Sequence, residues 1–394
     1  MRLNVAILSA CQACMFTTNS TLIVSAALIG VMLAPDPMMG TVPVAILFLF
    51  GMTFAMPASL LMKRVGRRNG FMIGLLSGIT GAIVSSFAII SHSFWIFSAG
   101  IALFGVANAF GAFYRFAAAD VSTESYRSRA ISYVLAGSVV AAFIGPNMTN
   151  LTKDAFSDAV FAGSYMALAA VYLLSFTLVS FLKVPVTDAE TKKTEGRPLR
   201  EIIVQPVFIL AVVSATVGYG VMNLLMTSTP LAMEVRGIEF SYTVQVIQWH
   251  IFAMFAPSFF TGHLVRRFGD LNIIFSGLVA LVACVGIVYI IGDSFIGFCL
   301  SLVSLGVGWN FTFLGATTLL TKTYRPSEKA IVQGFNDLCV FSTVTLTALM
   351  SGVLHHLWGW YVLSSGALVP IVLVAILVVW VRRKGHYPLP EAEA

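Results

Sequence analysis

Charged residues are scarce in this sequence. Only 10% of its 394 residues are Asp, Glu, Lys or Arg, whereas a soluble globular domain carries roughly 25%. So little polar surface excludes a soluble protein. The 58% of apolar residues, with a mean hydropathy of +0.91, excludes a disordered chain. Little is left to build a large domain outside a membrane.

Several chemical motifs are also missing. The sequence has no P-loop, so we expect no direct use of ATP. Its five cysteines fall within apolar runs, Cys11-x-x-Cys14 among them, so we predict neither disulfides nor a redox site. An enzyme embedded in the membrane, which is one alternative class, needs clustered acids, histidines or a nucleophile near one interface. The buried polar residues are too dispersed for that, so we expect no enzymatic activity, no metal and no cofactor.

Long apolar runs recur along the whole chain. A membrane-spanning helix needs about 20 apolar residues, so twelve need roughly 240, which 58% of 394 residues nearly supplies. The runs do not alternate apolar and polar positions, which excludes a β-barrel. We therefore predict an all-α membrane protein with twelve transmembrane helices. The expected spans are 5–33, 40–62, 71–91, 94–120, 130–151, 161–182, 206–232, 243–265, 273–291, 295–322, 330–354 and 361–381.

Lys and Arg are distributed unevenly between the segments that connect these spans. If the N-terminus lies inside, 20 of the 23 fall on the inner side, Lys153 and Arg236 fall on the outer side, and Arg115 lies within a span. The positive-inside rule then predicts that both termini are cytoplasmic. The net charge of +6 follows from this topology, so we expect no binding to nucleic acid. The expected location is the inner (cell) membrane of a bacterium.

The two halves of the chain repeat each other. A polar linker at 184–205 separates a predicted bundle at 1–183 from a second at 206–394. The loop Ser59-Leu-Leu-Met-Lys-Arg-Val-Gly-Arg-Arg68 aligns with Gly262-His-Leu-Val-Arg-Arg-Phe-Gly-Asp270 at an offset of 203. Repeats of equal orientation are related by an axis along the membrane normal. The fold class that we predict is therefore two pseudo-symmetric six-helix bundles.

These paired loops resemble the G-x-L-x-D-R-x-G-R-R signature of the major facilitator superfamily, and the resemblance in topology covers essentially the whole chain. It implies a secondary transporter and implies that Asp120 meets Arg64 or Arg67. Lys63 departs from the signature, since the family usually has Asp there. The loop residues that the resemblance marks are Arg64, Gly66, Arg67, Gly262, Arg267 and Gly269, together with Asp120.

The fifth span has a second likeness. Its Gly145-Pro146 is similar to a motif of the drug–proton antiporter branch of the family, but Asn147-Met-Thr-Asn150 replaces the expected closing glycines. Ile101 stands where antiporters often carry Arg. The likeness to drug efflux is therefore partial.

Polar side chains inside the spans indicate a central cavity. Spans three, six, nine and twelve hold essentially none and are expected to face lipid, whereas a polar group elsewhere needs protein or water around it. Residues seven apart share a helix face to within about 20°, as Gln12 and Asn19 do. The alternative is that the amides bind neighbouring helices together. The predicted cavity residues are Gln12, Asn19, Asn108, Tyr114, Arg115, Tyr219, Asn223, Gln248, Trp249 and Asn310.

Two charges lie within spans at similar depth, Arg115 in the first half and Asp337 in the second. We predict that they approach each other when the cytoplasmic side closes, because neither stays buried and unpaired cheaply. Protonation of Asp337 would weaken the pair and couple a proton to opening. Alternatively, Asp337 serves structure within its own half, or Arg115 holds an anionic substrate.

The sequence thus favours a monomeric secondary transporter that moves a small organic solute by alternating access, coupled to protons. The Gly-Pro motif weakly favours efflux as the direction of transport. The alternatives are an uptake symporter for an anionic metabolite and a non-transporting membrane sensor on the same fold. The expected partners are the small-molecule substrate, protons and the lipid bilayer.

Overall fold

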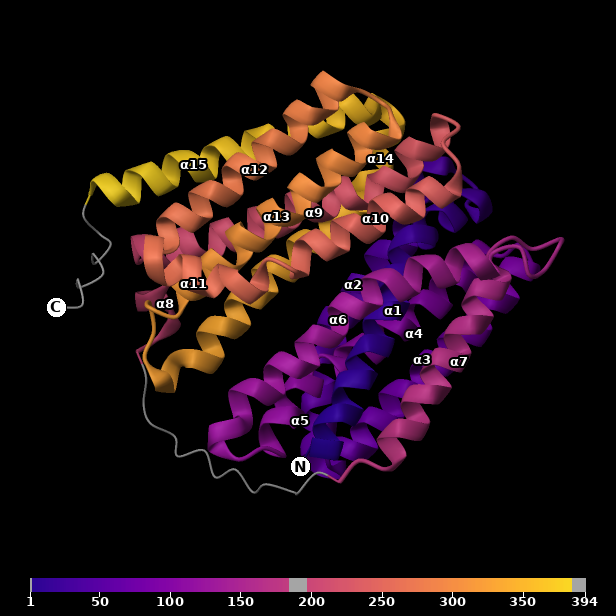
Figure 1. Ribbon diagram of the computed structural model, residues 1–394, viewed down its shortest axis with the longest axis horizontal. Helices are drawn as coiled ribbons and strands as arrows, with labels where there is room; N and C mark the ends of the chain where they lie inside the picture. The colour runs from indigo at the N-terminus through magenta and orange to yellow at the C-terminus, as the bar shows by residue number, and fades with distance from the viewer. Residues whose placement is uncertain (1, 184–196, 385–394) are drawn as a thin grey trace. The chain divides into compact units, whose positions relative to one another are not determined.

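A computed structural model describes residues 2–183 and 197–384, and within these ranges every regular element is a helix (Figure 1). The prediction of an all-α membrane fold is confirmed. Most of the predicted linker, 184–196, lies outside the described residues. The elements are α1 (Arg2–Leu33), η1 (Pro37–Met39), α2 (Val42–Val65), α3 (Arg67–Ile90), α4 (Phe94–Gly111), α5 (Tyr114–Asp120), α6 (Glu124–Thr152), α7 (Ala162–Ser180), α8 (Leu199–Ile202), α9 (Pro206–Val235), α10 (Phe240–Phe255), α11 (Ser258–Phe268), α12 (Asp270–Ile291), α13 (Phe295–Leu320), η2 (Pro326–Glu328), α14 (Lys329–Gly366) and α15 (Leu368–Arg383).

The long apolar runs form helices because a chain inside a bilayer must satisfy its own backbone hydrogen bonds. Nine stretches in the described part of the chain are long and apolar enough to cross a membrane, and the last of them, Ile331–Arg383, contains both α14 and α15. Helix α6 and the pair α10–α11 occupy the two remaining predicted spans. Each of the twelve predicted spans therefore has a helical counterpart.

Breaks within the spans have local causes. The eighth span is divided at Pro257, the N-cap of α11, because proline has no backbone N–H to continue α10. Helix α14 contains Gly359 at φ 72° and ψ 177°, a conformation that is essentially restricted to glycine. Gly359 therefore marks the turn between the eleventh and twelfth spans. The fourth span is interrupted between Gly111 and Tyr114, where α4 ends and α5 begins.

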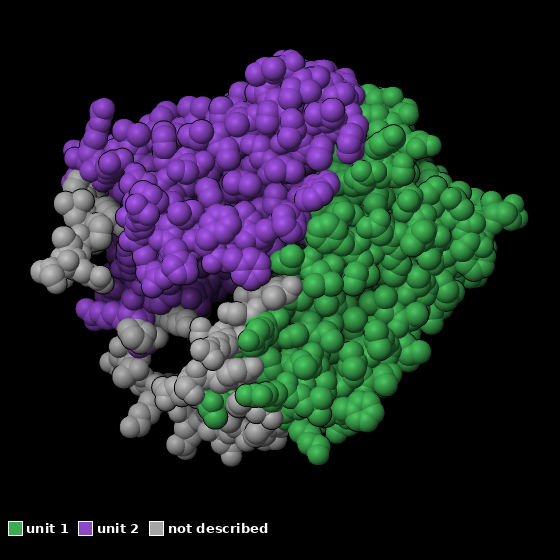
Figure 2. Space-filling view, viewed as in Figure 1, with its two compact units in different colours: residues 1–189, 227–248, 348–356 green, residues 190–226, 249–347, 357–394 purple. Residues whose placement is uncertain are grey.

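The chain folds into two compact units, coloured separately in Figure 2. Unit 1 comprises Met1–Ala189, Thr227–Gln248 and Ala348–His356. Unit 2 comprises Glu190–Met226, Trp249–Thr347 and Leu357–Ala394. Two short segments from the second half of the sequence thus pack within unit 1. The division into bundles at 1–183 and 206–394 stays a prediction.

Helix pairs that pack closely build each unit. In unit 1, α1 lies along α6, and α3 packs against both α4 and α7. Aromatic side chains fill the space between them: Phe104 stacks on Tyr172 at 5.8 Å between ring centroids, and Phe97 meets Tyr165 edge-on at 5.4 Å. In unit 2, α12 packs along α13 and also contacts α15.

Rows of exposed apolar side chains run along the helices of spans three, six, nine and twelve. These helices, α3, α7, α12 and α15, are the ones expected to face lipid. A bilayer accepts such side chains at no cost, whereas water does not. The exposed residues include Ile73, Leu76, Ile83 and Phe87 on α3, Leu173 and Leu174 on α7, Val279 and Ile290 on α12, and Val369, Leu373 and Ile376 on α15.

Candidate transport site

The amides of the first bundle form a pair inside unit 1. Asn108 on α4 donates from Nδ2 to Asn19 Oδ1 on α1 at 2.7 Å, and both side chains are half-buried. Gln12, two turns earlier on α1, is buried. Tyr114 is also buried, and its ring packs 4.7 Å from that of Phe71. Asn19 and Asn108 are therefore the more accessible polar groups of this set.

The corresponding amides of unit 2 are buried between helices. Asn310 Nδ2 donates to Met254 O and to Ser258 Oγ, each at 2.7 Å, and Asn310 Oδ1 accepts from Thr261 Oγ1 at 2.7 Å. Asn310 is fully buried with all its polar atoms paired, so here it joins α13 to α10 and α11. This geometry fits the packing role that the sequence left open as the alternative, and the assignment of Asn310 to the cavity stays a prediction.

Asn223, the other amide of this set, packs against a different helix. It is fully buried and donates from Nδ2 to Val344 O at 3.0 Å and to Thr347 Oγ1 at 3.2 Å. Both acceptors lie on α14, so Asn223 holds α9 against that helix.

An aromatic cluster lies beside these amides in unit 2, where Tyr219 on α9 meets Trp309 and Phe313 on α13 edge-on, each at 5.4 Å. Trp309 and Phe313 stack at 5.3 Å with planes 9° apart, and Phe255 on α10 lies 5.8 Å from Trp309. Phe341 on α14 lies 6.3 Å from Tyr219. We name these five residues the aromatic cluster.

The aromatic cluster joins four helices and keeps partly open faces, because Tyr219, Phe255 and Phe313 are half-buried and Phe341 is exposed. Trp309 is only 5% exposed, and within the described residues its indole Nε1–H has no hydrogen-bond acceptor. Buried Trp N–H groups usually find a partner. Sequence reasoning proposed Tyr219 but missed the three phenylalanines, because 31 Phe residues along the chain give no signal that separates these from the others.

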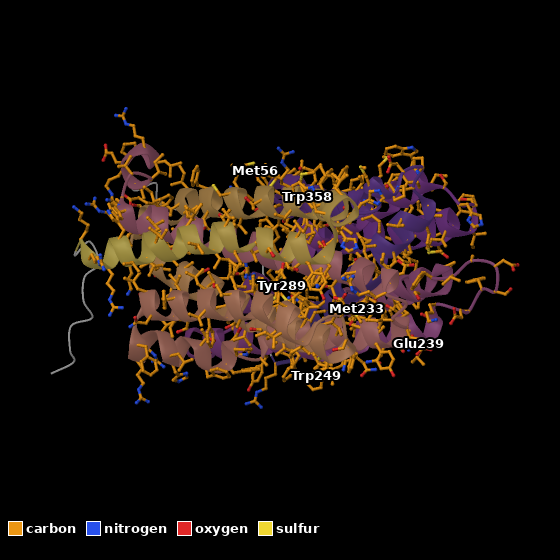
Figure 3. All side chains as sticks on the ribbon, turned by 90° about the horizontal axis from the view of Figure 1, so that it is seen from above. Met56, Met233, Glu239, Trp249, Tyr289 and Trp358 are labelled. Atoms are coloured by element: carbon orange, nitrogen blue, oxygen red, sulfur yellow. The ribbon has the colours of Figure 1, made fainter. Side chains whose placement is uncertain are left out.

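Trp249 is another aromatic residue that the sequence places in the cavity. It is 43% exposed and lies at one edge of the ribbon in Figure 3. Its ring contacts Phe252 edge-on at 5.7 Å. Trp249 therefore does not belong to the aromatic cluster.

Arg115 and Asp337 belong to different units. Arg115 on α5 is exposed, and its guanidinium lies 4.9 Å from the ring centroid of Phe116. Asp337 on α14 is exposed and accepts from Asn336 Nδ2 at 3.2 Å. The predicted approach of these two charges stays a prediction.

Unit 1 contains contacts between the two sequence halves at the helix ends far from the linker. Thr41, the N-cap residue of α2, donates from Oγ1 to Leu349 O and accepts from Gly352 N, each at 3.1 Å. A Cβ atom at Gly352 would lie 2.7 Å from Thr41 Oγ1. Only glycine therefore lets α14 approach Thr41 this closely.

Two further contacts continue this seam. Phe161 meets Phe240 edge-on at 5.1 Å, with Lys153 Nζ 5.8 Å from the Phe240 ring. Asn147 on α6 donates from Nδ2 to Gln248 Oε1 on α10 at 2.7 Å. This end of unit 1 is therefore closed between the two halves. We call Thr41, Leu349, Gly352, Phe161, Phe240, Asn147 and Gln248 the seam.

The two basic loops have the same backbone conformation. Gly66 has φ 83° and ψ 158°, and Gly269 has φ 81° and ψ 155°. Only glycine adopts this conformation readily, which accounts for glycine at both positions. Each glycine ends one helix and begins the next, α3 in the first loop and α12 in the second.

The residue after each glycine forms an ion pair, and the two pairs have opposite polarity. Arg67 Nε donates to Asp120 Oδ2 at 2.6 Å, whereas Lys322 Nζ donates to Asp270 Oδ2 at 2.5 Å. Arg67 aligns with Asp270 at the offset of 203 between the two halves. At the same offset Asp120 falls one position away from Lys322. Arg64 and Arg267 are exposed, and the Arg267 guanidinium lies 5.3 Å from the Phe268 ring. The resemblance left Arg64 and Arg67 open as partners of Asp120, and in this geometry Arg67 is the partner.

A third ion pair joins Arg197, which precedes α8, to Glu328 in η2. Arg197 donates from Nε and Nη2 to the two carboxylate oxygens of Glu328, at 2.9 and 2.8 Å. The backbone N–H groups of Arg197 and Arg325 also donate to Glu328, each at 2.8 Å. Glu328 is 1% exposed, and these four hydrogen bonds stabilise its buried charge. Sequence reasoning did not single out this pair, because the two residues are 131 positions apart.

This pair predicts a pH dependence of stability. The Arg197 guanidinium, with the backbone N–H of Arg325, holds the pKa of Glu328 well below its usual range. A carboxyl with a lowered folded-state pKa stabilises the fold above its unfolded-state pKa, about 4.3 for Glu, and loses this contribution as the pH falls toward the folded-state value. We expect the difference in melting temperature between wild type and Glu328→Gln to be largest at neutral pH and to shrink below about pH 4.

The matched control for that measurement is Glu239→Gln, which neutralises an exposed carboxyl in the loop before α10. Its melting curve is expected to follow wild type at every pH. A constant difference between wild type and Glu328→Gln across the range would contradict the predicted linkage.

Membrane-spanning helices arranged in two sequence repeats are typical of secondary transporters. The model of the Major Facilitator Superfamily (MFS) matches residues 8–344, and the chain therefore belongs to this superfamily. The predicted absence of enzymatic activity is confirmed, because proteins of this family move solutes and are not enzymes.

Relatives of known sequence support the same assignment. The chain is 38% identical over 394 residues to the riboflavin transporter RfnT of Brucella anthropi, covering 99% of this chain and 98% of the relative. It is 30% identical over 381 residues to the MFS-type transporter YddS of Bacillus subtilis, covering 90% and 86%. The chain is thus a transporter of a small solute.

Solved structures share the fold. A bacterial homologue of the human lysosomal transporter Spinster, in an inward-facing and unoccupied conformation, superposes with a TM-score of 0.73 at 16% identity, covering 98% of each chain. An auto-inhibited peptide transporter of the POT family gives a TM-score of 0.72 at 12% identity, covering 99% of this chain and 98% of the other. At these identities the likeness concerns the fold alone.

Proposed function

We propose that this transporter carries riboflavin or a closely related planar heterocycle. The observation that supports this most is the 38% identity to a riboflavin transporter along essentially the full length of both chains. The proposal also covers the location and topology expected from the sequence, namely a bacterial cell membrane with both termini in the cytoplasm and a monomeric transporter.

The aromatic cluster of unit 2 supports a planar, largely uncharged solute. Aromatic rings attract each other in stacked and edge-to-face arrangements, and each pair is worth about 0.5–1.5 kcal/mol beyond the area it buries. The half-buried faces of Tyr219 and Phe313 offer such contacts, and the Trp309 indole N–H offers a hydrogen bond. Such contacts are of the kind that a planar ring system makes.

The test is transport by the full chain, purified and placed in liposomes. We expect saturable uptake of radiolabelled riboflavin that unlabelled riboflavin competes away and that protein-free liposomes lack. If neither binding nor flux of riboflavin is detected while the protein stays folded, the proposed substrate is wrong. The same vesicles, loaded or empty, measure the direction of transport, for which the Gly-Pro motif predicts efflux.

An anionic solute is a second candidate, and the exposed Arg115 favours it. A guanidinium is the side chain best suited to phosphate or carboxylate. Flavin mononucleotide, which is riboflavin with a phosphate, separates the two candidates by competition against labelled riboflavin. We expect it to compete poorly in wild type and to be unaffected by Arg115→Gln. Strong competition that this substitution abolishes would favour the anionic substrate.

Proton coupling leads to a further prediction, for Asp337→Asn. If protonation of Asp337 drives opening, a side chain that carries no charge at any pH cannot couple a proton to transport. We expect Asp337→Asn to abolish accumulation of riboflavin driven by a pH gradient while exchange of labelled for unlabelled riboflavin continues. Asp154→Asn, in the exposed loop after α6, is the control and should behave like wild type. Undiminished accumulation by Asp337→Asn would rule out this coupling.

A further inference from the structure

The amide pair in the seam has a simple geometry. Asn147 Nδ2 donates one hydrogen bond to Gln248 Oε1 at 2.7 Å and a second to Phe143 O, in its own helix, at 2.8 Å. Both hydrogens of the Asn147 amide nitrogen are therefore used. The pair links α6, in the first half of the sequence, to α10, in the second.

The other polar atoms of this pair are unused. Within the described residues, neither Asn147 Oδ1 nor Gln248 Nε2 has a hydrogen-bond partner. The Asn147 side chain is exposed and that of Gln248 is half-buried. The pair thus presents one acceptor and one donor that a small molecule can reach.

This arrangement differs from the amides that hold helices together. Asn310 is fully buried, and its amide nitrogen and oxygen both form hydrogen bonds to partners within unit 2. Asn147 and Gln248 instead share a single hydrogen bond across the seam, and alternating access requires the two halves to part there. A solute that bonds to both amides uses Asn147 Oδ1 and Gln248 Nε2, the atoms that this hydrogen bond leaves unused, and links the two halves.

We propose that Asn147 and Gln248 recognise a solute through an amide or imide edge, in which an N–H group lies next to a C=O group. The N–H donates to Asn147 Oδ1 and the C=O accepts from Gln248 Nε2. The inference rests on the proposed function for its choice of solute. Riboflavin carries such an edge on its pyrimidine ring, where an N–H lies between two carbonyl groups.

The experiment compares three flavins as competitors of labelled riboflavin on the full chain in liposomes. Riboflavin has the imide edge, 3-methylriboflavin has a methyl group in place of the imide hydrogen, and lumichrome keeps the edge but lacks the ribityl chain. Losing a hydrogen bond weakens binding by up to about tenfold. We expect 3-methylriboflavin to compete about tenfold more weakly than riboflavin and lumichrome to retain most of its competition.

Side-chain substitutions test whether Asn147 and Gln248 recognise the imide edge. Asn147→Ala and Gln248→Ala should each weaken riboflavin about tenfold but leave 3-methylriboflavin nearly unchanged, so that the preference between the two ligands disappears. Gln245→Ala is the matched control, because Gln245 is an exposed amide one turn earlier on α10. It should preserve the full preference. Direct binding of 3-methylriboflavin shows that each variant is folded.

The possible failures can be told apart. If wild type binds riboflavin but accepts 3-methylriboflavin equally well, the amide edge is not recognised and the inference is overturned while the proposed substrate stands. The same holds if Asn147→Ala and Gln248→Ala keep the wild-type preference. If wild type binds no flavin, the proposed function fails, and the inference loses its solute with it.

Discussion

Gly352→Ala is expected to slow transport by about tenfold. The added Cβ would lie 2.7 Å from Thr41 Oγ1 and 3.0 Å from Thr41 Cγ2. Thr41 cannot easily move aside, because its hydroxyl is bonded to both Leu349 O and Gly352 N. Overpacking typically costs about 1–3 kcal/mol, and every 1.4 kcal/mol changes a population about tenfold. The substitution should therefore depopulate the state in which the seam is closed.

Two further variants make this prediction specific. Thr41→Ala removes the obstructing hydroxyl and methyl group, so the double variant Thr41→Ala with Gly352→Ala should recover most of the lost rate. Gly366→Ala adds a methyl group on the same helix where nothing lies within 4 Å, and it should transport like wild type. Initial rates of riboflavin flux in liposomes are the measurement. A wild-type rate for Gly352→Ala would show that the seam does not limit the cycle.

The second large effect is expected for Lys322→Met. Asp270 is fully buried, and Lys322→Met removes the ammonium group that lies 2.5 Å from its carboxylate. Breaking such a pair can cost 3–5 kcal/mol, but the Lys322 side chain is partly exposed, so we expect a loss of about 2 kcal/mol. The readout is the melting temperature of the purified protein, which should fall clearly.

The repeat supplies the control for this substitution. Arg67→Met breaks the corresponding pair of the first half, where the two side chains are 27% and 29% exposed. Exposed pairs contribute at most about 1 kcal/mol. It should therefore shift the melting temperature much less. Asp270→Asn combined with Lys322→Met removes the buried charge and should restore part of the stability. Equal shifts for Lys322→Met and Arg67→Met would show that burial of Asp270 has no effect on stability.

The fold was predictable from the sequence because a bilayer imposes strong constraints. Apolar runs of spanning length must be helical there, and Lys and Arg mark one side. The break at Pro257 also follows from local chemistry. Gly359 did not stand out in the sequence, because a glycine within an apolar run has no fixed conformation until its neighbours pack.

The site was less predictable, because polar residues at helical spacing serve both packing and transport. Asn19 and Asn310 look alike in sequence, yet Asn310 is enclosed by Met254, Ser258 and Thr261, which no local pattern connects to it. The pairing of Asn147 with Gln248 spans 101 residues and depends on which helices meet. Such contacts arise from tertiary packing, so periodicity can suggest the residues but not their partners.

The opposite polarity of the two loop ion pairs has a consequence for the ancestry of the chain. If the halves descend from one duplicated six-helix gene, one copy exchanged its cation and anion between two positions. Changing Arg67 to Asp alone would set two carboxylates together, and changing Asp120 to Lys alone would set two cations together. The loops of the two halves are therefore not interchangeable. A chimera with Arg67 in place of Asp270 would place two positive charges together, that arginine and Lys322.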